Sequence, residues 1–239
     1  MASPSERPVG SEPSAAGGPV ELLLLDVGGP LYDDECYARA LWRAVRELAG
    51  GVGEREFRAV YDEQRQRQTG SLRTAIAERF VPGADRAALS ALARSYWEYP
   101  PGSLYADVLP TLRELAGKYR VALVANQRAH VRAALARDGV EEFVDIWALS
   151  EEVGADKPDP AIFQHALGRA GVPAARAVHV GNRLDTDVRG AHRVGLRTVW
   201  VLRGEAPPEP TPEQLAEPDA VVHTLTELPA ALDKLQERR

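Results

Sequence analysis

Short runs of apolar residues alternate with amphipathic stretches along most of the chain. Leu22–Leu25 is an uninterrupted apolar run, as expected for a parallel strand that is covered on both faces. We predict further strands at Val121–Val124, Val144–Leu149, Ala177–Val180, Thr198–Leu202 and Ala220–Val222. Because helical patterns separate these runs, the fold class predicted is α/β, with a doubly wound, Rossmann-like parallel sheet and right-handed crossovers.

The helical patterns between these strands have apolar residues at intervals of three and four positions. We predict helices at Val108–Lys118, Val131–Arg137, Pro160–Ala170, Asp187–Val194 and Leu228–Gln236. The segment Gly204–Asp219 contains five prolines, and we expect it to be an exposed loop.

Residues 34–100 differ from the rest of the chain because no strand interrupts their helical pattern. Apolar residues recur at helical spacing in four short stretches, around Leu41, Phe57, Ile76 and Leu92. Four successive amphipathic helices are typical of a self-contained bundle inserted after the first strand. We therefore divide the chain into a tail at residues 1–18, an α/β core at 19–33 and 101–239, and a helical cap at 34–100.

Composition excludes several classes of partner. A net charge of −6 and a pI near 5.5 argue against nucleic acid, because phosphate backbones require clustered basic residues. No segment approaches the ~20 consecutive apolar residues of a membrane span. Residues 1–18, rich in Ser, Pro, Gly and Ala, lack the apolar region of a secretory signal, and we expect them to be disordered.

The single cysteine, Cys36, excludes an internal disulfide framework and suits a reducing cytoplasm. We therefore expect a cytoplasmic protein that acts on a small molecule, without a nucleic acid or membrane partner. Whether the protein is a monomer or a homodimer stays open.

Polar side chains follow the predicted strands at the edge where parallel sheets place their ligands. Four separate segments contribute them: Asp26, Asn126-Gln127, Lys157 and, after the strand at 177–180, Asn182, Arg183 and Asp187. Lys157 stands out because the chain has only three lysines. We expect these side chains to meet in one crevice.

The order and spacing of these residues resemble the haloacid dehalogenase-like (HAD) superfamily, from about residue 21 to residue 202. The motifs that carry the resemblance are Asp26 at the first strand end, Lys157-Pro158-Asp159-Pro160, and Gly181-Asn182-x4-Asp187 followed by Gly190-Ala191. The helical segment matches the cap of the C1-capped subfamily. The resemblance implies that Asp26 is a nucleophile that forms an aspartyl ester, and that Lys157 keeps it ionised. It gives Asp187 the task of orienting the lysine, a metal ion or a water.

The resemblance also implies contacts between the protein and its substrate. The residues at the matching positions are Gly28, Asn126, Gln127, Asn182 and Arg183. Haloacid dehalogenases grip their anionic substrate with a cap arginine, for which the chain offers Arg39, Arg43, Arg65, Arg67 and Arg73. Phosphonoacetaldehyde hydrolases use a cap lysine instead, and residues 34–105 contain none.

Four positions depart from the magnesium phosphatases that make up most of the superfamily. At positions 28 and 182, where those enzymes carry aspartate, this chain has Gly28 and Asn182. Pro30 stands in place of their threonine, and Ala125 in place of their serine or threonine. Gly28 lacks the acid/base group for a phosphate leaving group, worth ~10²–10⁴ in rate. Asn182 exchanges a charged metal ligand for a neutral amide. The remaining Asp26, Lys157 and Asp187 sum to a net charge of −1, which does not call for a dication.

We therefore predict a HAD-like hydrolase with degenerate motifs, in which Asp26 attacks a small anionic substrate at carbon without metal. No cofactor is expected, and Mg²⁺ is disfavoured. The fit to haloacid dehalogenases is incomplete, because they carry an aromatic residue at position 28 and a serine at position 125. Two alternatives stay open: a catalytically silent HAD-fold protein that binds a ligand, and a weak Mg²⁺-dependent phosphatase.

Overall fold

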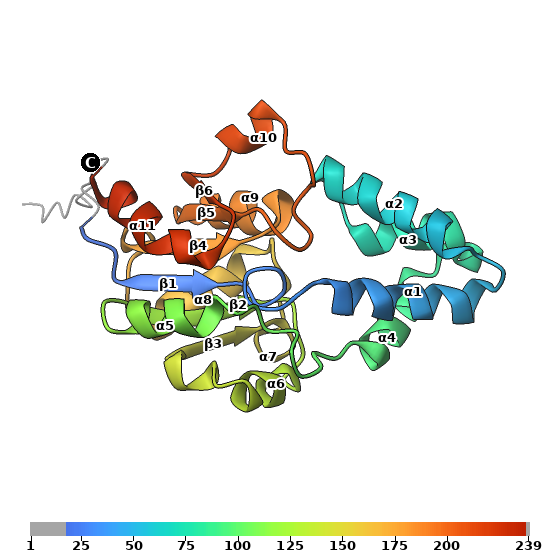
Figure 1. Ribbon diagram of the computed structural model, residues 1–239, viewed down its shortest axis with the longest axis horizontal. Coiled ribbons are helices and arrows are strands. Elements are labelled where there is room, and N and C mark those ends of the chain that lie inside the picture. The colour runs from blue at the N-terminus through green and yellow to red at the C-terminus, as the bar shows by residue number, and fades with distance from the viewer. Residues whose placement is uncertain (1–17, 238–239) are drawn as a thin grey trace, which may run out of the picture.

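A computed structural model describes residues 18–237, so all of the predicted tail except Gly18 lies outside the described residues. Six parallel strands form one sheet in the order β3-β2-β1-β4-β5-β6 (Figure 1). Their bounds are β1 Leu22–Leu25, β2 Arg120–Ala125, β3 Ile146–Leu149, β4 Ala177–Gly181, β5 Arg197–Val201 and β6 Ala220–Val222. The predicted fold class is confirmed.

Helices cover both faces of the sheet because alternate residues of each strand point to opposite sides. On one side Leu23 and Leu25 of β1 pack with α5 (Val108–Ala116), α6 (Val131–Arg137) and α11 (Leu228–Glu237). On the other side Leu22 and Leu24 pack with α8 (Pro160–Ala170) and α9 (Arg189–His192). Burial of β1 on both faces explains its uninterrupted apolar sequence.

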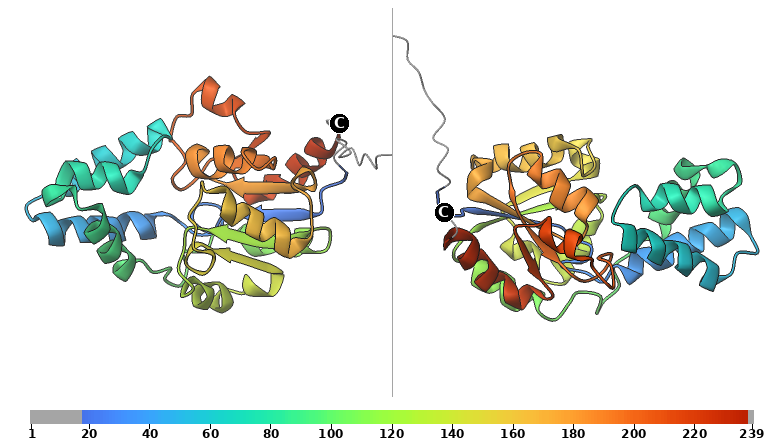
Figure 2. Two further views of the ribbon diagram at one scale, coloured as in Figure 1. Left: turned by 180° about the vertical axis from the view of Figure 1, so that it is seen from behind. Right: turned by 90° about the horizontal axis from the view of Figure 1, so that it is seen from above.

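Four helices with a separate apolar cluster follow β1. They are α1 (Glu35–Ala49), α2 (Glu54–Arg67), α3 (Leu72–Phe80) and α4 (Arg86–Tyr96). Residues such as Leu41, Phe57 and Ile76 form a core of their own, distinct from the two clusters on the sheet. Figures 1 and 2 show this group beyond the carboxyl ends of the strands, where the predicted site lies.

Local structure departs from the predictions in two places. The segment expected as one helix at Asp187–Val194 begins with a π-helical turn at Leu184–Val188, and α9 follows it. The segment expected as an exposed loop at 204–219 contains α10 (Pro212–Ala216), and its residues 205–207 are buried. Proline at the first position of α10 and a capping box between Thr211 and Gln214 explain the short helix.

Shorter elements complete the chain. α7 (Ser150–Val153) follows β3, and 3₁₀ turns lie at Pro82–Ala84, Glu141–Phe143, Ala174–Arg176 and Leu225–Glu227. Among the described residues, no helix has the length and apolar character needed to cross a bilayer.

Candidate active site

The carboxyl edge of the sheet brings Asp26, Lys157 and Asp187 together, as predicted for their positions. Lys157 Nζ lies 2.8 Å from Asp26 Oδ1 and 2.7 Å from Asp187 Oδ1. Lys157 and Asp187 are buried, whereas the Asp26 side chain keeps 16% of its surface exposed. One ammonium group therefore bridges a partly accessible carboxylate and an inaccessible one.

The two oxygens of Asp26 have different surroundings. Oδ1 accepts a hydrogen bond from the backbone N–H of Val27 at 2.8 Å and forms an ion pair with Lys157. Oδ2 has no hydrogen-bond partner among residues 18–237, and Asp26 lines a cavity. Burial raises the pKa of the Asp26 carboxyl to about 7, although the charge of Lys157 opposes the rise. Oδ2 is therefore the oxygen available to a substrate.

Lys157 is positioned through its backbone by Asn126, which follows β2. Asn126 Nδ2 donates to the Lys157 carbonyl at 3.0 Å, and the Lys157 N–H donates to Asn126 Oδ1 at 2.6 Å. Asn126 also lines the cavity, but both ends of its amide are engaged. The structure therefore shows Asn126 holding the lysine loop, and its predicted contact with substrate stays a prediction.

Asp187 is fully satisfied by partners within the protein. Its Oδ1 faces Lys157 and lies 3.2 Å from His179 Nε2, and its Oδ2 accepts from the backbone N–H groups of Asn182 and Arg183 at 3.1 and 3.0 Å. Although burial alone favours the neutral acid, Lys157 and these donors hold the pKa of Asp187 well below its usual range. Asp187 therefore stays ionised and anchors the lysine.

His179 on β4 was not among the predicted site residues, because a histidine on a strand is commonly a packed side chain. It is buried, and its ring stands edge-on to Phe163. Burial lowers the pKa of His179. The signal that points to it is position: it lies two residues before the strand end that carries the glycine-asparagine motif.

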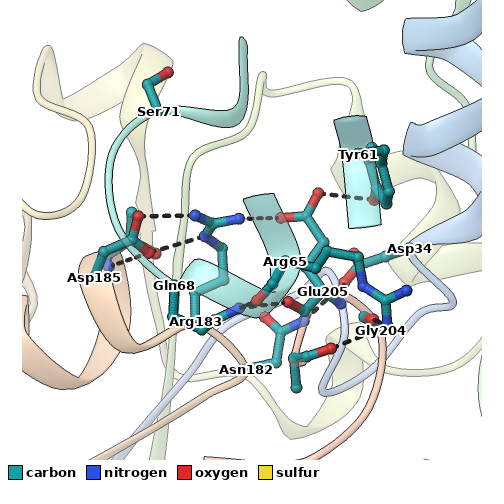
Figure 3. Close-up of polar contacts among 12 residues, drawn as sticks. Asp34, Tyr61, Arg65, Gln68, Ser71, Asn182, Arg183, Asp185, Gly204 and Glu205 are labelled. Atoms are coloured by element: carbon teal, nitrogen blue, oxygen red, sulfur yellow. Dashed lines mark hydrogen bonds and ion pairs between the residues drawn. The ribbon is translucent and has the colours of Figure 1, made fainter. Parts of the chain in front are cut away.

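A carboxylate that was not predicted for the site, Asp34, lies next to Gly28. A Cβ atom at position 28 would meet Asp34 Oδ1 at 2.6 Å. Asp34 Oδ2 accepts from Asn182 Nδ2 at 2.7 Å and from the backbone N–H of Glu205 at 2.9 Å (Figure 3). Burial and the charge of Glu205 raise the pKa of Asp34 well above its usual range. The sequence signal was weak because an acid just before a helix is commonly a capping residue.

Arg183 and Gln127 are engaged with the protein. Figure 3 shows the Arg183 guanidinium between Asp185 and Glu205, with Nε 2.9 Å from Asp185 Oδ1 and Nη1 3.1 Å from Glu205 Oε2. Gln127 Nε2 donates to the Tyr99 hydroxyl at 2.9 Å. The predicted contacts of both residues with substrate stay predictions. The net charge of −1 that the sequence analysis summed for the site did not include Asp34 and Glu205.

A cavity of about 640 Å³ lies between the sheet edge and the four helices after β1. Its lining joins Asp26, Gly28, Asp34 and Lys157 with residues of the loop before α3 and with Arg73 of α3. Its size suits a small molecule.

Of the five cap arginines considered, only Arg73 lines this cavity. Arg65 donates to the carbonyls of Gly204 and Ala206, and Arg43 stacks on Tyr96. Arg39 and Arg67 pair with acids one helical turn away on their own helices. Arg73 makes no ion pair with any residue in 18–237.

Comparison with known proteins identifies the family. Residues 20–195 match the family described as haloacid dehalogenase-like hydrolase. This match covers well over half of the chain. The protein belongs to the haloacid dehalogenase-like hydrolases.

Named members of the family include phosphatases and dehalogenases. Over 103 residues the chain is 42% identical to a glyceraldehyde 3-phosphate phosphatase of Methanopyrus kandleri, which covers 42% of this chain and 44% of that protein. Over 187 residues it is 35% identical to a phosphoserine phosphatase of Thermus thermophilus, which covers 77% of this chain and 67% of that protein. The chain thus spans less than half the length of the Methanopyrus kandleri protein.

Among solved structures, a 2-haloacid dehalogenase from Pseudomonas syringae pv. Tomato DC3000 aligns with 90% of this chain and 99% of its own, with a TM-score of 0.59 and 25% identity. The YfnB protein of Bacillus subtilis, a putative HAD-hydrolase bound to magnesium, aligns with a TM-score of 0.68 and 21% identity. These likenesses confirm the fold of a HAD-like hydrolase.

The donor set of this HAD-like hydrolase does not fit a Mg²⁺ ion well. Mg²⁺ binds chiefly through carboxylate oxygens and waters. Asn182 offers a neutral amide whose Nδ2 faces Asp34, and Asp26 Oδ1 is paired with Lys157. Across residues 18–237, no three side chains of His, Cys, Asp or Glu are grouped to hold a metal ion.

Proposed function

We propose that this HAD-like hydrolase forms a covalent ester between Asp26 and a small anionic substrate, by attack at carbon and without a metal ion. The observation that carries the proposal is Lys157 Nζ, 2.8 Å from Asp26 Oδ1 and 2.7 Å from Asp187 Oδ1. An ammonium group fixed at these distances favours the ionised form of Asp26. It supplies the positive charge that a dication would otherwise bring.

The chemistry begins at Asp26 Oδ2, the oxygen that accepts no hydrogen bond from residues 18–237. It forms a bond to the substrate carbon while the leaving group departs with the bonding electrons. Water then hydrolyses the ester and returns Asp26 to its carboxylate. Attack at carbon needs no hydroxyls to cradle phosphoryl oxygens, which agrees with Pro30 and Ala125 at the positions where phosphatases carry them.

Arg73 supports the proposal that the substrate is anionic. Arg73 lines the same cavity as Asp26, and it forms no ion pair with any of the described residues. Arginine binds a carboxylate through two parallel hydrogen bonds, which fixes orientation as well as charge. A substrate carboxylate at Arg73 would leave its reacting carbon in the same cavity as Asp26.

The test measures chloride release from both enantiomers of 2-chloropropionate, with and without EDTA. We expect turnover that EDTA does not change, and none in Asp26→Asn. Lys157→Ala removes the ammonium group that pairs with the nucleophile, so kcat falls by roughly 10²-fold or more. The matched control is Lys118→Ala, an exposed lysine paired with Glu114. Loss of turnover in EDTA and its return with Mg²⁺ would contradict the metal-free mechanism.

A second candidate function is hydrolysis of small phosphate esters. The observation that favours it is the identity of the relatives, since the two curated proteins described above are phosphatases. Turnover of p-nitrophenyl phosphate that depends on Mg²⁺, with no chloride release from chloro-acids, would select this candidate. Silence of the wild type toward both probes would favour a binding protein.

A further inference from the structure

The volume above Gly28 is occupied by a carboxylate from a different part of the chain. The Cβ position of residue 28 lies 2.6 Å from Asp34 Oδ1 and 3.3 Å from the Tyr99 hydroxyl. A carboxylate side chain at position 28 would therefore need the space that Asp34 takes. Residue 28 carries no carboxylate, but the carboxylate of Asp34 occupies the space that a side chain at position 28 would fill.

Hydrolysis of the Asp26 ester requires a group that accepts a proton from water. Asp187 is poorly suited, because Lys157, His179 and two backbone N–H groups already engage both of its oxygens. Asp34 differs: its Oδ2 is held by Asn182 and Glu205, and its Oδ1 makes no hydrogen bond to any described residue. Asp34 also lines the cavity together with Asp26.

The surroundings of Asp34 favour proton exchange. Two donors from different loops fix the orientation of the carboxyl group and aim Oδ1 toward Gly28. Burial, the charge of Glu205 and the charge of Asp26 raise its pKa. The raised pKa favours the neutral acid in the free enzyme. Esterification removes the charge of Asp26, one of the causes of the rise, and so favours the ionised Asp34 at the step where a base is needed. The other titratable groups near Asp34 are Cys36, Tyr61, Tyr99 and Tyr105.

We propose that Asp34 is the general base that activates water for hydrolysis of the Asp26 ester, in place of a carboxylate at position 28. The proposal rests on the proposed function. The water oxygen bonds to Asp26 Cγ, and one water proton passes to Asp34 Oδ1. The bond between Cγ and the ester oxygen then breaks, and the departing alkoxide takes the proton from Asp34. The second water proton leaves as Asp26 returns to its carboxylate.

The first experiment separates ester formation from ester hydrolysis. Asp34→Asn keeps the size of the side chain but cannot accept the proton, so we expect kcat to fall by ~10²-fold or more. With 2-chloropropionate as the probe, intact-protein mass spectrometry should detect the Asp26 ester in Asp34→Asn and not in Asp26→Asn. The matched control is Asp33→Asn, an adjacent exposed aspartate whose Oδ1 accepts from the Glu35 N–H.

The second experiment moves the carboxylate to the other position. Gly28→Asp alone must displace Asp34, so we expect it to lose activity. In the double variant Gly28→Asp with Asp34→Gly the space is free, and we expect turnover about tenfold above either single variant, since neighbouring substitutions couple. Circular dichroism of each variant reports whether it folds.

If the wild type is active, two results would overturn the role of Asp34 and leave the proposed function intact. One is an Asp34→Asn variant that turns over within about twofold of Asp33→Asn, less than a general base contributes. The other is a slow Asp34→Asn variant that accumulates no ester, because a structural role slows both steps equally. A wild type that releases no chloride overturns the proposed function together with this role.

Discussion

At the scale of single residues, the site depends on how one ammonium group is shared between two carboxylates. Asp187 pairs with Lys157, contacts His179 and accepts hydrogen bonds from two backbone N–H groups, and these contacts lower its pKa. Asp26 receives Lys157 and one backbone donor, and its burial outweighs both, so its pKa rises to about 7. The same lysine therefore leaves one acid permanently charged and the other close to its titration point at neutral pH.

The pH dependence of ester formation tests this difference. Because only the ionised Asp26 attacks, the rate of ester formation should increase as the pH rises through about 7. Removal of the opposing charge in Lys157→Ala raises the pKa further, so the residual activity should need a higher pH. Single-turnover mass spectrometry from pH 5 to pH 9 measures both profiles, with Lys118→Ala as the control. A wild-type profile that is already flat from pH 5 upward would contradict the raised pKa.

At the scale of elements, the carboxyl end of α2 is fastened to the core by polar contacts. Gln68, which follows α2 with a φ of 51°, is buried, and its Nε2 donates to the Glu205 carbonyl at 2.8 Å. Its Oε1 accepts from the Leu184 N–H at 2.9 Å, and Tyr61 donates to Glu205 Oε1 at 3.0 Å. Figure 3 shows these residues around the loop that also holds Asp34. Cap and core therefore meet at the walls of the cavity.

Gln68→Ala tests whether this contact stabilises the docked arrangement. The substitution leaves the buried Leu184 N–H and Glu205 carbonyl without their partner, which costs about 1–3 kcal/mol for each unsatisfied group. We expect a lower free energy of unfolding and faster amide exchange in α2, measured by urea denaturation and mass spectrometry. Glu63→Ala, on the exposed side of α2, should change stability by less than about 0.5 kcal/mol. Equal effects of the two substitutions would count against the contact.

At the scale of the whole molecule, the proposed mechanism takes the reacting groups of the cavity from the core and the substrate-binding group from the helices after β1. Asp26 and Lys157 come from the sheet edge, and Arg73 comes from α3. A substrate that fills this cavity would contact both parts at once. This division separates binding from chemistry, and the two are measurable separately.

Arg73→Ala tests the substrate-binding group. Loss of a charged hydrogen bond worth roughly 1.5–3 kcal/mol should raise KM for 2-chloropropionate by about tenfold or more, with a smaller change in kcat. Arg67→Ala, whose exposed side chain pairs with Glu63, is the control and should leave KM unchanged. A fall in kcat with unchanged KM would place Arg73 outside substrate binding.

The sequence predicted those parts of the site that end a strand. Asp26, Asn126 and Asn182 follow β1, β2 and β4, and parallel pairing alone brings such positions to one edge. Asp34 and Glu205 were missed because their place depends on how two loops fold over that edge. No periodicity records such a contact, and the prolines after Glu205 pointed instead to an exposed loop.

The position of Asp34 has a consequence for how chains of this kind are sorted. A motif search that asks for an acid two positions after the nucleophile finds Gly28 and discards the sequence as inert. The acid in that volume is supplied six positions further along the chain. If Asp34 acts as proposed, surveys that rely on local signatures will count as silent those proteins in which a neighbouring loop supplies the missing side chain.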